Sequence, residues 1–248
     1  LNSQSSKKYS FIKNMAYTFH IKNTKLMKHG LEAFDKQYFG HFFKKYDFQE
    51  VMYYYRFFQG WIRFLERFLP IKNGRGKKVL EIGCGIGAFA RILYERGFNV
   101  EATDISAYIL KKAKKNQPNI DFKILDIEKN TLSENKFDYI FALEVMEHLK
   151  NPIRALKNSK KMLKKGGTLV FSTPYPTKEA LADPFHININ LPEFWLSEGK
   201  KIGFKNVEVK YASFVPFLYR IHSLFSLALP LRIDSRFINS TCFYFFRK

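Results

Sequence analysis

The spacing of apolar residues divides the chain into a helical first part and an alternating second part. Between residues 26 and 69, apolar side chains recur every three or four positions, which predicts helices that end before Pro70. Two glycines at residues 72–78 mark a linker. We therefore expect an N-terminal lead-in and helical cap or lid over residues 1–72, followed by one folded domain over residues 73–248.

Beyond the linker, short apolar runs that predict strands alternate with amphipathic runs that predict helices. Strands are predicted at residues 79–82, 99–103, 120–125, 137–143, 168–172, 207–211 and 241–246. Helices are predicted at residues 88–96, 106–115, 152–165 and 191–201, the third of them closed by a pair of glycines. This alternation is typical of an α/β fold with a mainly parallel sheet and helices on both faces. The apolar residues 214–234 form an insertion between the last two strands.

A glycine-rich turn, VLEIGCGIG, follows the first predicted strand and precedes its helix. Gly83, Cys84, Gly85 and Gly87 make a turn whose backbone can approach a ligand closely, at the sheet edge where α/β proteins bind nucleotides. The turn also satisfies the dinucleotide fingerprint. Glu81 beside it would repel a pyrophosphate, whereas it would attract the ammonium and sulfonium groups of S-adenosylmethionine. The turn therefore favours S-adenosyl-L-methionine as the cofactor.

Two acidic residues follow the next two predicted strands. Asp104 ends the second strand, where its carboxylate can accept hydrogen bonds from both ribose hydroxyls, and Ile105 follows it. Asp126 follows the third strand and is placed to receive the adenine amino group, with the Ile127 backbone at the ring edge. Leu143, at the end of the fourth strand, completes the predicted cofactor site.

Candidate chemistry gathers after the fourth and fifth strands. Glu144, Glu147 and His148 follow the fourth strand, and His186 follows the fifth. Two carboxylates and two imidazoles at one sheet edge predict a divalent-cation site, for magnesium or manganese. In an alternative without metal, His148 or His186 acts as general base, with Glu144 as a further catalytic candidate. In another alternative without metal, Glu147 or His148 caps and orients the next helix or contacts the cofactor.

The chain resembles the class I, S-adenosylmethionine-dependent methyltransferases, in the broad group that includes the ubiquinone-biosynthesis O-methyltransferases. The resemblance covers residues 77–210 through VLEIGCGIGAFA, VEATDIS, LDI, FDYIFALEVMEHL and LKKGGTLVFSTP. It implies a Rossmann-like sheet of seven strands with the last antiparallel, and methyl transfer from S-adenosylmethionine. The E-x-x-E-H pattern with a later histidine is also similar to one that carries a metal in small-RNA 2′-O-methyltransferases.

Composition constrains location and partners. The 248 residues carry 42 lysines and arginines against 22 acids, a net charge of +20 that favours phosphate-rich partners. With two cysteines and lysines interrupting every apolar run near the N-terminus, we expect a cytoplasmic protein. Residues 214–231 are too interrupted to span a bilayer, but they fit peripheral membrane contact, a dimer interface or a lid.

The leading functional hypothesis is O-methylation of a small-molecule, quinone, lipid or glycan acceptor. The first alternative is an RNA 2′-O-methyltransferase that uses the two glutamates and two histidines to hold a metal, although no RNA-binding module is recognisable in the sequence. A second alternative, from another class, is a non-catalytic protein that only binds S-adenosylmethionine. The intact glycine turn and its two following acids favour catalysis.

Overall fold

An eight-stranded sheet with helices on both faces organises the residues that the computed structural model describes, which are residue 39 and residues 48–215, 218–233 and 240–248. The strands are β1 (Lys78–Ile82), β2 (Asn99–Asp104), β3 (Asp121–Ile124), β4 (Phe137–Leu143), β5 (Leu163–Pro174), β6 (Asn206–Phe214), β7 (Ala228–Leu229) and β8 (Ser240–Arg247). The helices are α3 (Phe48–Leu65), α4 (Ala88–Glu95), α5 (Ala107–Asn116), α6 (Pro152–Met162), α7 (Lys178–Ala182) and α8 (Pro192–Ile202). Three 3-10 turns are η2 (Met146–His148), η3 (Leu218–Arg220) and η4 (Ser223–Phe225).

The strand order is β3-β2-β1-β4-β5-β8-β6-β7. Strands β3, β2, β1, β4 and β5 are parallel to one another, and β8 lies antiparallel between β5 and β6. The predicted mostly parallel sheet with an antiparallel last strand is confirmed. The predicted number of seven strands is wrong by one, because Ala228 and Leu229 pair with Phe214 and Ser213 and add the short edge strand β7.

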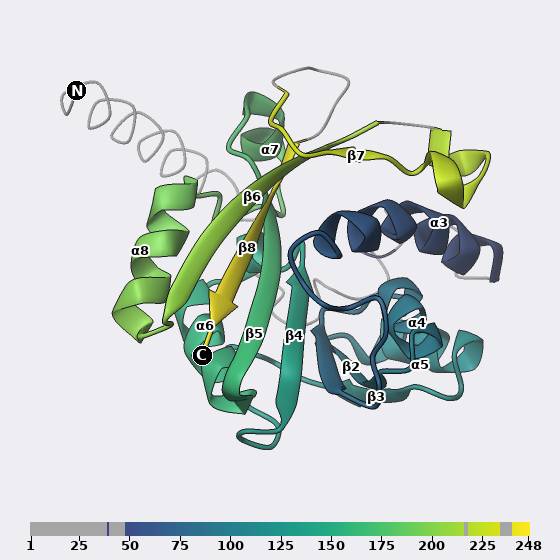
Figure 1. Cartoon of the computed structure of the whole chain (residues 1–248), viewed down its shortest axis with the longest axis horizontal. Helices are drawn as coiled ribbons and strands as arrows, with labels where there is room; N and C mark the ends of the chain where they lie inside the picture. Colours follow the sequence, from purple (N-terminus) through teal and green to yellow (C-terminus); the bar gives the residue numbers. More distant parts are fainter. Residues whose placement is uncertain (1–38, 40–47, 216–217, 234–239) are drawn as a thin grey trace.

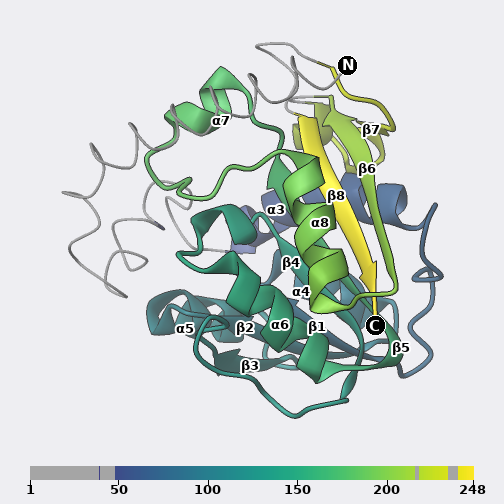
Figure 2. The same ribbon diagram turned by 90° about the vertical axis from the view of Figure 1, so that its left-hand side faces the viewer.

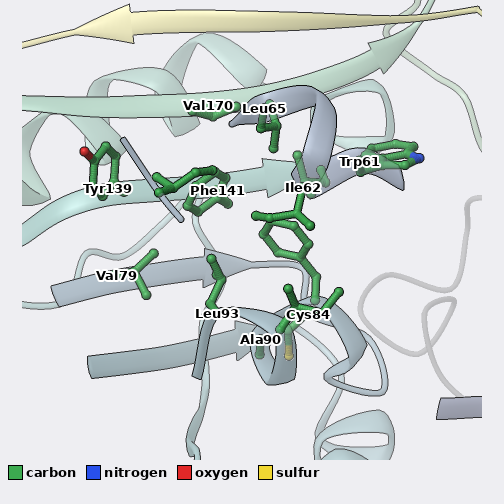
Figure 3. Close-up of a cluster of buried hydrophobic side chains, with 14 of the residues drawn as sticks. Trp61, Ile62, Leu65, Val79, Cys84, Ala90, Leu93, Tyr139, Phe141 and Val170 are labelled. Atoms are coloured by element: carbon green, nitrogen blue, oxygen red, sulfur yellow. The ribbon is translucent and has the colours of Figure 1, made fainter. Parts of the chain in front are cut away.

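Each face of the sheet is covered by its own helices and its own hydrophobic cluster. Helices α3, α4 and α5 cover one face, while α6 and α8 cover the other (Figures 1 and 2). Figure 3 shows the first cluster, to which α3 contributes Trp61 and Ile62 and the sheet contributes Phe141 and Val170. On the second face, the fully buried Trp195 of α8 packs on the sheet. Burial of apolar surface on both faces holds the strand ends in fixed positions.

The structure corrects the prediction that a glycine pair closes the helix starting at residue 152. Helix α6 ends at Met162, because Leu163 already pairs with Phe137 and begins β5. The pairing then moves to Tyr139 with Thr168, so Gly166, with φ +78°, lies in an irregularity of the strand. The short helix α7, within the loop after β5, has too few residues for a periodic pattern and was not predicted.

Helix α3 is the described part of the predicted N-terminal cap, and its inner side belongs to the core. Trp61, Ile62 and Leu65 are at most 3% exposed. Its outer side holds the segment of residues 218–233: the Ser226 hydroxyl donates to the Phe57 carbonyl at 2.7 Å and accepts from the Gly60 amide at 3.1 Å. Residues 1–38 and 40–47 of the predicted cap lie outside the described residues.

Gly60 allows the close approach of this segment to α3. A Cβ atom at residue 60 would lie 2.3 Å from Ser226 Oγ and 2.6 Å from its carbonyl oxygen. Alanine would gain about 1 kcal/mol in helix propensity, but the overpacking costs about 1–3 kcal/mol. We expect Gly60→Ala to lower the free energy of unfolding in urea, whereas Gln49→Ala at an exposed site of the same helix should not. Equal stability of the two variants would contradict this packing account.

Candidate active site

The glycine turn between β1 and α4 adopts a backbone that side chains disfavour. Gly83, Gly85 and Gly87 have φ angles of +72°, +52° and +80°. A Cβ atom on Gly83 would also lie 2.4 Å from Cγ2 of Val145, which follows β4. Gly87 is the N-cap of α4 and contributes no side-chain cap. The backbone of the turn is therefore close to the carboxyl ends of β1 and β4 and forms the floor of the candidate site.

Asp104 ties the turn to the end of β2. One of its carboxylate oxygens accepts from the Gly85 amide at 3.0 Å, and the other accepts from the Ser106 amide at 3.0 Å. Burial raises the pKa of Asp104 to about 6, although these amide hydrogen bonds and one from Ile105 act to lower it. The Cys84 amide also donates to the Thr103 carbonyl at 2.9 Å. Thus the predicted ribose-binding residue also fixes the position of the turn.

Glu81 belongs to β1, and its almost completely buried side chain reaches the first turn of α4. Its carboxyl group accepts a hydrogen bond from the Ala90 amide in the first turn of that helix. Its Oε2 atom has no hydrogen-bond partner among the described residues. Burial raises the pKa of Glu81 well above its usual value, and the charge of Asp104 raises it further. The first turn of α4 therefore already donates a backbone hydrogen bond to an acidic side chain, that of Glu81.

Two predicted cofactor contacts have side chains that face the protein interior. The Cys84 thiol and the Leu143 side chain belong to the hydrophobic cluster on the α3 face (Figure 3 labels Cys84). Burial raises the pKa of the Cys84 thiol well above its usual value. At these two positions, only the backbone is placed to meet a ligand.

Asp126 and Ile127 lie after β3, where they organise a tight turn. The Asp126 carboxylate accepts from the Glu128 amide at 3.1 Å and pairs with the Lys129 ammonium at 2.9 Å. The Ile127 carbonyl accepts from the Asn158 side chain at 2.7 Å. These contacts fix the turn beside β2, since the Leu125 amide bonds to the carbonyl of Asp104.

Glu144 occupies a strained backbone position at the end of β4. Its φ is +53°, in a region that residues other than glycine rarely adopt. The Ser172 hydroxyl accepts from the Glu144 amide at 2.9 Å and donates to its carboxylate at 2.7 Å. Burial raises the pKa of Glu144 to about 7. Ser172 was not among the predicted site residues. The signal that could have identified it is its position near the carboxyl end of β5, the strand beside β4.

The two predicted histidines lie side by side, with ring centres 5.1 Å apart. Nδ1 of His148 donates to the Phe185 carbonyl at 3.0 Å, and Nδ1 of His186 donates to the Ala180 carbonyl at 2.8 Å. A carbonyl can only accept, so each Nδ1 carries the proton and each Nε2 keeps its lone pair when the ring is neutral. Burial and the neighbouring His186 lower the pKa of His148 to about 4.

Glu147 brings a fully buried carboxyl group to the same place. One ligand atom each from Glu147, His148 and His186 lies within 4.8 Å of the others. Neither carboxylate oxygen of Glu147 has a hydrogen-bond partner among the described residues. Burial raises the pKa of Glu147 well above its usual value, and the charge of Glu144 raises it further. Among the described residues, this group contains three of the four predicted metal ligands. The fourth, Glu144, does not belong to it.

The sequence profile of the family described as "Methyltransferase domain" matches residues 52–209 of the chain, which include the glycine turn, Asp104 and the Glu147 group. The chain belongs to this methyltransferase domain family. Its sheet is also that of the class I, S-adenosylmethionine-dependent methyltransferases, as the sequence predicted.

Curated relatives and solved structures agree with this methyltransferase assignment. The chain is 35% identical over 116 residues to the ubiquinone biosynthesis O-methyltransferase of Coxiella burnetii, a match covering 45% of the chain and 48% of the relative. The corresponding protein of Idiomarina loihiensis is 37% identical over 105 residues, covering 40% and 42%. The chain thus spans about half the length of the curated relatives it matches.

Among solved structures, phosphoethanolamine N-methyltransferase 2 of Haemonchus contortus, in complex with S-adenosyl-L-methionine, is similar with a TM-score of 0.59 at 19% identity. That match covers 82% of this chain and 57% of the other. A methyltransferase from Archaeoglobus fulgidus gives a TM-score of 0.57 at 19% identity and covers 75% and 92%. At these identities the structural matches establish the shared fold.

The buried carboxyl of Glu81 predicts a specific effect on the stability of the cofactor-free methyltransferase domain. Because folding raises its pKa, the stabilisation present at low pH is lost as the pH rises and the buried group must ionise. Glu81→Gln keeps an oxygen for the Ala90 amide and removes the ionisation. We expect this variant to gain about 1–3 kcal/mol in free energy of unfolding at pH 8, but little at pH 5.

Urea unfolding at the two pH values measures this difference. Glu134→Gln, at an exposed loop position, is the matched control and should follow the wild type at both pH values. A constant difference between Glu81→Gln and wild type across the pH range would contradict the raised pKa.

Proposed function

We propose that this methyltransferase domain transfers the methyl group of S-adenosylmethionine to an oxygen atom of a small-molecule acceptor, of the quinone, lipid or glycan-precursor class. The observation that carries the cofactor assignment is the buried Glu81 carboxyl at the start of α4, beside the glycine turn. A dinucleotide would place its pyrophosphate at this helix N-terminus. Burial disfavours the ionised form of Glu81, and a pyrophosphate would disfavour it further, whereas the ammonium and sulfonium of S-adenosylmethionine would favour the carboxylate and pair with it.

The other cofactor contacts follow from the order of the strands. Asp104 at the end of β2 would accept hydrogen bonds from the ribose hydroxyls, and the turn at Asp126 and Ile127 would meet the adenine. The methyl group would then point toward the ends of β4 and β5, where Glu144, Glu147 and the two histidines lie. Since the sulfonium already activates the methyl group, the chain must mainly hold the acceptor in line with it and accept a proton from the acceptor hydroxyl.

The choice of oxygen as the acceptor atom rests on the curated relatives. Those matched above are named ubiquinone biosynthesis O-methyltransferases, and the aligned stretches cover less than half of this chain. His148 and His186 are candidates to receive the hydroxyl proton, because each donates through Nδ1 to a backbone carbonyl, so that each neutral ring carries its basic lone pair on Nε2.

Replacing Asp104 tests the cofactor site. Hydrogen bonds to a charged group are worth about 1.5–3 kcal/mol each, so we expect Asp104→Ala to weaken binding of S-adenosylhomocysteine at least tenfold in calorimetric titration. Wild-type affinity should fall as the pH is lowered through about 6, the pKa of Asp104, because the protonated group accepts less well.

Asp138→Ala is the matched control for this replacement. Asp138 also accepts from a backbone amide, that of Lys78, but it lies at the start of β4 rather than at the carboxyl edge. Its loss should leave the affinity for S-adenosylhomocysteine unchanged. Equal affinity of the Asp104→Ala variant and wild type would contradict the proposed cofactor site, and methylation of RNA but of no small acceptor would contradict the proposed acceptor class.

We also propose that Glu147, His148 and His186 bind a divalent cation. The three residues fit such an ion: both Nδ1 atoms donate to backbone carbonyls, which puts the basic lone pair of each neutral ring on Nε2, and the buried Glu147 carboxyl oxygens have no hydrogen-bond partner in the described part of the chain. Two imidazoles and one carboxylate suit manganese, iron or zinc better than magnesium. A bound cation would stabilise the hydroxylate form of the acceptor.

Metal binding can be measured without any methyl transfer. We expect metal-stripped wild type to bind one manganese ion per chain in an electron paramagnetic resonance titration. His186→Gln should weaken binding at least tenfold, while His222→Gln, at an exposed site, should not. No manganese binding by the wild type, or equal binding by His186→Gln, would contradict the metal site and leave the histidines as candidate bases.

A further inference from the structure

The segment between β6 and β8 displays an unusual concentration of exposed apolar side chains. Of nine large hydrophobic residues that are exposed in the described part of the chain, six lie within residues 221–231. We call this set the apolar surface, and it consists of Ile221, Leu224, Phe225, Leu227, Leu229 and Leu231. Their exposed fractions run from 39% to 71%. Single exposed apolar residues are ordinary, whereas a contiguous group in one segment indicates a contact surface.

Polar contacts on the inner side of the segment hold it against α3. The guanidinium of Arg63 donates to the carbonyls of Ser223 and Ser226, both at 2.7 Å. The hydroxyls of Tyr53 and Tyr219 share a hydrogen bond of 2.6 Å. Ser226 is 3% exposed and bonds to α3 as described above. Because these contacts fix the backbone, the apolar side chains between them point away from the core on a preformed support.

The charges in this segment are all positive. Residues 218–233 contain two arginines, Arg220 and Arg232, and no acidic residue. Both arginines are exposed. The whole chain carries a net charge of +20. A second copy of the chain would bring the same charge to the interface and would be repelled, whereas a surface of anionic lipid headgroups is attracted.

We propose that the apolar surface docks this protein on an anionic lipid bilayer, with its aliphatic side chains inserted at the headgroup boundary. No helix in the described ranges has the length and apolarity needed to cross a membrane. Contact through short turns and the edge strand β7 instead gives peripheral binding, in which apolar burial and attraction of the arginines to anionic lipids act together.

The place of the apolar surface also orients the candidate active site. Strand β6 runs parallel to β5, because both lie antiparallel to β8, so the segment that follows β6 starts from the same sheet edge as the glycine turn (Figure 1). Docking would bring this edge toward the bilayer. Attachment itself does not depend on methyl transfer, so it can fail or succeed independently of the proposed function.

Sedimentation with vesicles tests the proposal on the full chain. Vesicles of phosphatidylcholine with and without phosphatidylglycerol are the probes. The test variant is Ile221→Ser, Leu224→Ser and Leu227→Ser combined, which keeps the contacts of Arg63, Tyr219 and Ser226. The matched control combines Tyr94→Ser and Ile124→Ser, two exposed apolar residues elsewhere. Circular dichroism and thermal unfolding verify that each variant is folded.

We expect wild type and control to sediment with the anionic vesicles, and the triple variant to partition at least tenfold more weakly. Binding to neutral vesicles should also be weaker than to anionic ones. Failure of wild type to sediment with anionic vesicles would overturn the proposal. Equal partition of the triple variant and wild type would also overturn it, because the net positive charge of the chain alone would then explain attraction to the vesicles. A wild-type dimer that the triple variant abolishes would assign the surface to a second copy instead.

Discussion

The carboxylate of Asp104 holds the candidate site together. It accepts hydrogen bonds from Gly85 in the turn after β1 and from Ser106 at the start of α5. Two segments that are distant in the sequence, the turn after β1 and the junction of β2 with α5, therefore share one buried acceptor at the sheet edge. The burial of both sheet faces makes this possible, because it fixes β1 and β2 side by side with Ile82 opposite Thr103.

The same edge gathers carboxyl groups in a buried setting. Burial raises the pKa of Glu81, Asp104, Glu144 and Glu147. Without a cationic ligand, each of these groups costs free energy when it ionises. A ligand that carries an ammonium and a sulfonium would relieve this cost near Glu81, and a divalent cation would relieve it near Glu147. Carboxyl groups with raised pKa thus gather where the proposed ligands bind, as is common at functional sites.

The sequence predicted the sheet well because each strand is a short apolar run between turn residues. The ends of β1 and β4 and the N-cap at Ser106 agree with prediction. The errors arose where tertiary pairing overrides local pattern. Leu163 leaves the helical pattern to pair with Phe137, and Leu229 gains a strand partner only because α3 holds the segment beside β6.

The candidate site was predictable in its members and less so in their contacts. The order of the acids after the strands identified Asp104, Glu147 and His148. Nothing in the sequence gives the hydrogen bond between Ser172 and Glu144, because it depends on the register of β4 against β5. Likewise, the direction of the Cys84 side chain depends on how the turn packs on the core, which the glycine pattern does not specify.

The central claim is that the glycine turn beside Glu81 accepts a cationic adenosine cofactor rather than a dinucleotide. Calorimetric titration of the purified wild-type chain with S-adenosylhomocysteine and, separately, with NAD tests it most directly. Saturable one-to-one binding of S-adenosylhomocysteine with no detectable binding of NAD is the predicted result. Binding of NAD without binding of S-adenosylhomocysteine would contradict the account.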